Sequence, residues 1–147
     1  MSDCIFCKII AGEIPSAKVY EDQDVYAFLD ITQVTPGHTL VIPKQHVTDL
    51  FEYDAALAAR TMSKLPKIAR AIKRAFPEVK GLNLVNNNGA TAYQSVFHSH
   101  FHLIPRYQVE EGFAMRFDNH MDTYTPEEFQ ARATQIAQQL EQEEDNE

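Results

Sequence analysis

Three histidines, His98, His100 and His102, alternate with other residues in one short stretch of the chain. Alternation with a period of two is typical of a β-strand, so the imidazoles are expected on one face while Phe101 and Leu103 point into a core. Side chains on one strand face are roughly 6.5–7 Å apart. Because the whole chain has only 6 histidines, a solvated face that uses histidine by chance is the weaker interpretation. The row predicts either a metal site or a nucleophile directed at a phosphate, and spacing alone does not choose between them.

Cys4 and Cys7 form a second group with chemical potential, and they are the only cysteines of the chain. Two thiols separated by two residues have the spacing of zinc knuckles. A redox pair and two idle thiols are the alternatives, although no βαβ unit with the motif opening a helix is evident. Zinc needs two further ligands, and the histidines of the chain are the candidates.

Polar residues near the ends of predicted strands complete the set. Asp30 closes an apolar run, where it either faces a cleft or belongs to a turn. His38 and His46 flank a predicted strand, and each alone is more often structural than functional. Asn86–Gly89 and Gln94–Ser95 supply amides and a hydroxyl shortly before the three histidines, as the oxygens of a bound phosphate would require.

The hydrophobic pattern predicts the elements that must position these groups. Strands are expected at 19–22, 25–31, 38–43, from 81 into the polar tip 86–89, and through the histidine stretch. A long helix is expected at 54–76, capped by Asp54 and bent or divided at Pro66. Thr125 and Pro126 predict the start of a last helix, and residues 141–147 are an acidic end that is expected to fray. The apolar face of that helix comprises Phe129, Ala133, Ile136, Ala137 and Leu140.

Size and composition set broad limits. A chain of 147 residues with 44% hydrophobic residues can build one core, so a single domain over 1–147 is expected. The net charge of −8 and the pI near 5.2 disfavour broad nucleic-acid binding, although a small phosphorylated ligand needs only local donors. No apolar run approaches a membrane span and no secretory signal is visible, so a reducing cytoplasm is the expected location.

The stretch from His98 to Ile104 resembles the defining motif of the histidine triad (HIT) family. The resemblance implies an α+β fold with a five-stranded antiparallel sheet, a long helix and a C-terminal helix. It also implies a homodimer whose two sheets join into ten strands, a zinc knuckle at 1–10, and a C-terminal helix with an acidic tail at 125–147. The Cys-x-x-Cys motif is similar to that of the bacterial Hint-like branch. Other segments in family order are Phe28–Ile31, His38–Lys44, Asn86–Gly89 and Gln94–Val96.

The same resemblance implies a purine nucleotide-binding hydrolase. Such an enzyme cleaves nucleoside phosphoramidates or dinucleoside polyphosphates at the α-phosphate through a covalent nucleotidyl-histidine. His100 would be the nucleophile, His102 and Ser95 would assist it, and His38 would pack beside the triad. The implied nucleotide-binding residues are Asp30, Ile31, Asn87, Gln94, Ser95, His100 and His102. The alternative is a nucleotide-sensing or protein-docking module with incidental turnover.

The resemblance also implies which residues would bind a metal ion and which would not. It implies a structural zinc site, with no metal required for the chemistry, whose ligands are Cys4, Cys7, His46 and His98. Zinc held by all three triad histidines is disfavoured because successive positions on one strand face lie too far apart. Two departures from the family pattern stand out. Ser99 stands where an apolar residue is usual, which implies looser packing. Ala92 and Tyr93 stand where glycines are common, and Tyr93 would narrow the leaving-group side.

Overall fold

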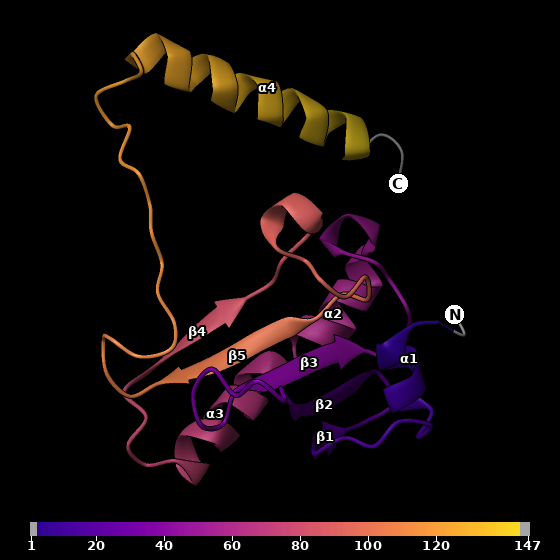
Figure 1. The fold of residues 1–147 in the computed structure, drawn as a ribbon. Coiled ribbons are helices and arrows are strands. Elements are labelled where there is room, and N and C mark those ends of the chain that lie inside the picture. Colours follow the sequence, from indigo (N-terminus) through magenta and orange to yellow (C-terminus); the bar gives the residue numbers. More distant parts are fainter. Residues whose placement is uncertain (1–2, 145–147) are drawn as a thin grey trace. The chain divides into compact units, whose positions relative to one another are not determined.

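The computed structural model describes residues 3–144 of the chain, without the side chains of residues 141 and 144. Five strands form one sheet in the order β1-β2-β3-β5-β4, and every neighbouring pair is antiparallel (Figure 1). The strands are β1 Lys18–Glu21, β2 Val25–Leu29, β3 Thr39–Pro43, β4 Gly81–Val85 and β5 Phe101–Arg106. The predicted α+β fold with a five-stranded antiparallel sheet is therefore confirmed.

Apolar side chains alternate along β2 and build a core on each face of the sheet. On one face, Val25 and Ala27 belong to a cluster with Ile68 of α3 (Leu65–Ala75). On the other face, Tyr26 and Phe28 belong to a cluster with Phe6 and Ile9 of α1 (Ile5–Ile10). The sheet is thus covered on both faces by helices that come from distant parts of the sequence.

The predicted long helix over 54–76 is divided into α2 (Ala55–Met62) and α3. Asp54 caps α2 by accepting a hydrogen bond from the amide of Leu57 at 2.7 Å. The break falls just before Pro66, which has no amide hydrogen and stands in the first turn of α3. Both expectations for this segment are confirmed. None of the helices within residues 3–144 is long and apolar enough to cross a membrane.

The histidine stretch enters the sheet later than its alternation predicts. β5 begins at Phe101, so only His102 of the three histidines lies within a regular strand. The carbonyl of His98 accepts a hydrogen bond from Nδ1 of His100 at 2.8 Å, and the carbonyl of His100 accepts one from Asn86 Nδ2 at 2.9 Å. Because side chains take these two backbone acceptors, the prediction of one strand through all three histidines is wrong.

The two edges of the sheet differ in chemistry. β1 carries an ion pair between Lys18 and Glu21, and its register with β2 shifts between Lys18 and Tyr20. β4 forms the opposite edge and exposes Leu82 and Leu84. Charges and irregular register protect an edge strand from further pairing, whereas a regular apolar edge invites it.

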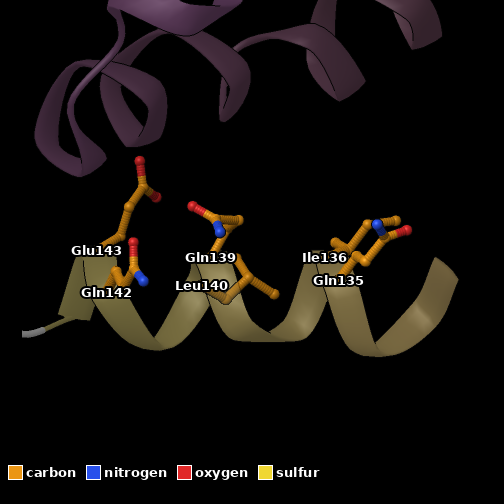
Figure 2. A pocket seen from close by; sticks show the side chains of 6 residues that line it. All are labelled: Gln135, Ile136, Gln139, Leu140, Gln142 and Glu143. Atoms are coloured by element: carbon orange, nitrogen blue, oxygen red, sulfur yellow. The ribbon is translucent and has the colours of Figure 1, made fainter. Parts of the chain in front are cut away.

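The chain divides into two compact units, Met1–Ala114 and Met115–Glu147. The second unit contains α4 (Pro126–Glu144), whose predicted cap is present: Thr125 Oγ1 accepts a hydrogen bond from the amide of Glu128 at 3.2 Å. The rest of the predicted acidic end, 145–147, lies outside the described residues. Figure 2 shows six side chains on α4: Gln135, Ile136, Gln139, Leu140, Gln142 and Glu143. None of these six is a thiol or an imidazole, the groups that the sequence predicted to bind metal or attack phosphorus.

Candidate active site and metal cluster

The four predicted metal ligands, Cys4, Cys7, His46 and His98, meet at one point. His98 Nδ1 lies 3.4 Å from Cys4 Sγ, 3.5 Å from Cys7 Sγ and 3.1 Å from His46 Nδ1. Cys7 Sγ lies 3.4 Å from His46 Nδ1. A tetrahedral zinc ion with two sulfur and two nitrogen ligands keeps them roughly 3.3–3.8 Å apart, because its bonds are about 2.0–2.3 Å long. Three of the four observed separations lie in this range, and the two imidazole nitrogens, 3.1 Å apart, are slightly closer.

Local structure brings these four atoms together. Cys4 is the N-cap of α1, and its Sγ accepts a hydrogen bond from the amide of Cys7 at 3.3 Å, which turns both thiols to the same side. His98 Nε2 lies 2.8 Å from the carbonyl oxygen of Pro43. A carbonyl only accepts, so this nitrogen carries the ring proton. The lone pair on Nδ1 of His98 therefore faces the thiols, as a metal ligand requires.

The protonation of the cluster fits a cation site. Burial, together with the neighbouring Cys4 thiol, raises the pKa of Cys7 to about 11. Burial lowers the pKa of His98 to about 4, although its hydrogen bond to Pro43 acts in the opposite direction. The imidazole is thus neutral, as a ligand must be, and a bound divalent cation would draw the proton off each thiol. Two sulfurs and two imidazole nitrogens are a donor set for zinc rather than for magnesium or calcium.

His100 is held as a neutral ring with one free nitrogen. Its Nδ1 donates to the carbonyl of His98 at 2.8 Å, so the lone pair lies on Nε2. Burial lowers the pKa of the imidazole, while this hydrogen bond and the carboxylate of Asp30 act in the opposite direction. A neutral imidazole with a free Nε2 can attack an electrophilic phosphorus.

His102, His38 and Asp30 form a relay next to His100. The amide of Val34 donates to His38 Nδ1 at 3.3 Å, so the His38 proton is on Nε2, which lies 2.9 Å from His102 Nδ1. His102 accepts that bond and must carry its own proton on Nε2. Asp30 Oδ2 lies 3.7 Å from His38 Nε2 and 3.9 Å from His102 Nδ1. The relay therefore fixes His102 as a hydrogen-bond donor through Nε2.

The charges of the relay are set by its burial. Burial lowers the pKa of His102 to about 4; the neighbouring His100 and His38 add to this, and Asp30 opposes it. Burial lowers the pKa of His38 as well, again against Asp30. For Asp30, burial raises the pKa, but hydrogen bonds from Thr32 and the two imidazoles outweigh it and hold the pKa below its usual range. Near neutral pH the relay thus combines neutral imidazoles with one carboxylate.

The same three residues lie close enough to share a metal ion. The tautomer of His38 argues against this use, because Val34 occupies Nδ1 and the Nε2 that faces the cluster carries the proton. A metal ligand needs a lone pair at that position. Zinc held by all three triad histidines is also disfavoured, because His98 turns its Nδ1 toward the thiols.

Gln94 holds the loop that precedes the histidines. Its Nε2 donates to the carbonyls of Thr48 at 2.7 Å and Val96 at 3.0 Å, and its Oε1 accepts from the amide of Gly89 at 2.7 Å. The side chain predicted to contact phosphate is thus buried and engaged in loop contacts. Tyr93, the preceding residue, has a left-handed backbone with φ of 68° and is 88% exposed.

Three other predicted nucleotide-binding residues are exposed or partly buried. Ile31 is 97% exposed. Ser95 is exposed and Asn87 half-buried, and within residues 3–144 neither makes a side-chain hydrogen bond, so both polar groups are available to a ligand. Ser95 borders a hollow of ≈ 360 Å³ together with Asp3, Cys4, Ile5, Val96 and Phe97.

Two residues that the sequence did not single out, Phe6 and Tyr53, contact His100 and Ser99. The Phe6 ring stands edge-on to His100, with ring centroids 5.1 Å apart. Its place between the two cysteines was the one usable signal in the sequence. The hydroxyl of Tyr53 donates to Ser99 Oγ at 2.9 Å, and Ser99 is fully buried. Ser99 is therefore buried and hydrogen-bonded rather than loosely packed. The periodicity of the sequence does not indicate its pairing with Tyr53.

An antiparallel five-stranded sheet that carries three clustered histidines beside a two-cysteine, two-histidine cluster defines a known class of protein. Residues 11–109 match the family model described as the HIT domain. The chain belongs to the HIT family. "Protein hit" from Bacillus subtilis is 56% identical over 138 residues, which cover 94% of this chain and 94% of the relative.

Further comparisons bear on the fold and on the chemistry of relatives. A crystal structure of a HIT family member from Bacillus subtilis has a TM-score of 0.89 at 57% identity and covers 92% of this chain and 96% of its own. A zinc-bound histidine triad family protein from Mycobacterium smegmatis has a TM-score of 0.71 at 33% identity, covering 93% and 97%. A Candida albicans relative named adenosine 5′-monophosphoramidase is 42% identical over 117 residues, covering 78% and 77%.

Proposed function

We propose that the chain is a purine nucleotide-binding hydrolase that cleaves nucleoside phosphoramidates or dinucleoside polyphosphates at the α-phosphate. The observation that carries the proposal is the state of His100: a buried neutral imidazole with Nδ1 bonded to the carbonyl of His98 and Nε2 free. Nucleotide binding alone does not require a poised nucleophile. The name of the Candida albicans relative makes adenosine phosphoramidates the first substrate class to test.

The proposed reaction has two displacements at phosphorus. In the first, the lone pair of His100 Nε2 forms a bond to the α-phosphorus, and the bond from phosphorus to the leaving nitrogen or oxygen breaks. The leaving group takes that electron pair and a proton. In the second, water attacks phosphorus, the bond to Nε2 breaks, and water gives up a proton that replaces the one taken by the leaving group, so that a nucleoside monophosphate and neutral His100 result. The carbonyl of His98 supports both steps because it stabilises the positive ring of the covalent intermediate.

The remaining roles in the proposal follow from position and hydrogen-bonding capacity. His102 donates through Nε2 to a phosphate oxygen, and its tautomer is set by His38. Ser95 and Asn87 offer a hydroxyl and an amide to the phosphate, and Ser95 passes a proton to the leaving group. Asp30 and Ile31 contact the nucleoside, and the remaining residue, Gln94, contributes by shaping the phosphate loop.

Zinc and a second copy of the chain belong to the same proposal. Cys4, Cys7, His46 and His98 would hold a zinc ion whose contribution when bound is structural: it ties α1 to the sheet. A homodimer would pair the two β4 edges and extend the sheet to ten strands. The exposed Leu82 and Leu84 on β4 support this choice of edge.

Trapping the covalent intermediate tests the proposal. The full chain is mixed with an adenosine phosphoramidate, and the reaction is quenched at mildly alkaline pH because phosphoryl-histidine is acid-labile. The mass of the intact protein is then measured by mass spectrometry. We expect a mass increase of one adenylyl group, which is AMP less water, and this increase should be absent in His100→Ala. His120→Ala is the matched control, because His120 is exposed and lies in the second unit. Its adduct and turnover should equal those of the unaltered chain.

Two results would overturn the proposal. Turnover that survives in His100→Ala would mean that another group attacks phosphorus. Tight AMP binding by the unaltered chain, without adduct or hydrolysis on any phosphoramidate or dinucleoside polyphosphate, would identify a nucleotide-sensing module instead.

A further inference from the structure

Phe6 connects the metal cluster to the proposed nucleophile. It lies in α1 between Cys4 and Cys7 and is 6% exposed. Its ring centroid is 5.1 Å from that of His100, with the planes at 85°, and 5.8 Å from that of His98, with the planes at 73°. Edge-to-face pairs at these separations are favourable and depend on orientation. A side chain of α1 therefore restrains the tilt of the His100 ring.

His98 provides a second connection between the same two sites. Its Nδ1 lies among the cluster atoms, while its carbonyl accepts the Nδ1 hydrogen of His100 at 2.8 Å. Any movement of His98 that accompanies gain or loss of a cation is thus transmitted to the acceptor that sets the His100 tautomer. The two connections are independent, because one runs through the backbone and the other through an aromatic contact.

We propose that α1 is a positioning element for His100, that Phe6 is its positioning residue, and that zinc on the four-ligand cluster keeps α1 in place. Phe6 acts through the ring of His100. Phe28 supports it from the sheet, with ring centroids 5.6 Å apart and planes at 74°. Only the kinetic part of this proposal rests on the proposed function.

The expected effect follows from the geometry of attack. Nε2 must point along the line of the breaking bond, and a misplacement of about 1 Å costs about 100-fold in rate. Without the Phe6 ring, His100 keeps its hydrogen bond to the carbonyl but gains room to tilt about it. Nucleotide binding uses other contacts, so the loss should fall on the chemical step and leave AMP affinity unchanged.

The kinetic test uses the zinc-loaded full chain with Phe6→Leu and Phe6→Ala. Phe117→Leu is the matched control, because Phe117 is 83% exposed and lies in the second unit. We expect the single-turnover rate of nucleotidyl transfer to fall about 10- to 100-fold in Phe6→Leu and further in Phe6→Ala. AMP affinity and zinc content should match those of the control. Equal rates in all three variants would overturn the assignment of Phe6.

A second readout needs no turnover. Nitrogen NMR spectra of the histidine rings distinguish the two tautomers. In the zinc-loaded protein, His100 should appear as one tautomer with its proton on Nδ1. Removal of zinc with a chelator should broaden or mix this signal, and added zinc should restore it. In Phe6→Leu the signal should stay broadened when zinc is added, because the ring tilts about the hydrogen bond that it keeps. A His100 signal that is the same with and without zinc, and the same in Phe6→Leu as in the unaltered chain, would overturn the proposal.

The two readouts separate the possible failures. If the unaltered chain forms no nucleotidyl adduct, the proposed function fails, while the response of the His100 signal still decides the positioning role. If Phe6→Ala does not fold, Phe6→Leu and the zinc titration of the unaltered chain decide it.

Discussion

Removal of the Tyr53 hydroxyl tests how the buried serine between two histidines is accommodated. Ser99 is 0% exposed, and its Oγ accepts the Tyr53 hydroxyl at 2.9 Å. Tyr53→Phe leaves that oxygen buried without its donor, which we expect to lower the free energy of unfolding by about 1–3 kcal/mol. Ser99→Ala leaves the Tyr53 hydroxyl without its acceptor on a residue that is only half-buried, so a smaller loss of about 0.5–1.5 kcal/mol is expected.

The double variant makes this prediction decisive. Replacing both partners by apolar groups removes the buried mismatch, so Tyr53→Phe with Ser99→Ala should cost about 1 kcal/mol less than the sum of the single variants. Urea unfolding with linear extrapolation measures all four proteins. Tyr93→Phe is the matched control, because Tyr93 is 88% exposed, and it should change stability by less than about 0.5 kcal/mol. Additive costs would refute the view that the two hydroxyls stabilise the fold as a pair.

Three further perturbations probe charge, metal and relay. Burial raises the pKa of Asp22, but its lysine and tyrosine partners and two amides outweigh this and hold the pKa below its usual 3.8. Asp22→Asn should therefore lower the free energy of unfolding by about 1–3 kcal/mol at neutral pH. The difference between the variant and the unaltered chain, measured by urea unfolding, should vanish as the pH falls through the acid range, where the carboxyl protonates. A pH-independent gap would contradict this assignment. Cys7→Ser should lower zinc content and the thermal midpoint together, as followed by metal analysis and calorimetry; an unchanged midpoint would show that α1 is held without the ion. His38→Ala should lower kcat about 10- to 100-fold with AMP affinity retained, since the His102 tautomer is no longer set. His38→Gln, which still donates, should lose less, and equal losses in both would contradict the relay.

Regular elements were predictable because their signals are local. The missing amide hydrogen of Pro66 predicted the break between α2 and α3, and the carboxylate of Asp54 predicted the cap. The apolar run that begins at Val25 predicted a strand, and the structure shows that the two faces of this strand enter different cores. In each case the residue type alone restricts the backbone.

Side-chain bonds to the backbone were not predictable in the same way. Alternation placed the three histidines on one strand, whereas the His100 ring takes the carbonyl of His98 and Asn86 takes that of His100, which delays the strand to Phe101. The partner of Ser99 is Tyr53, 46 residues away, and no periodicity links them. The candidate site residues could be named by resemblance, but the tautomers of their histidines required the positions of the hydrogen-bond partners.

The unlike edges of the sheet would also limit the size of the proposed assembly. Pairing of β4 with β4 of a second copy about a two-fold axis would consume both leucine-bearing edges in a single closed contact. The strands left at the outside would be two copies of β1, each with its Lys18–Glu21 ion pair and shifted register. A third copy would meet an edge with an ion pair and an irregular register in place of the two exposed leucines. In the proposed dimer, pairing through β4 would therefore make association self-limiting, and loss of a charge on β1 would open a route to further pairing.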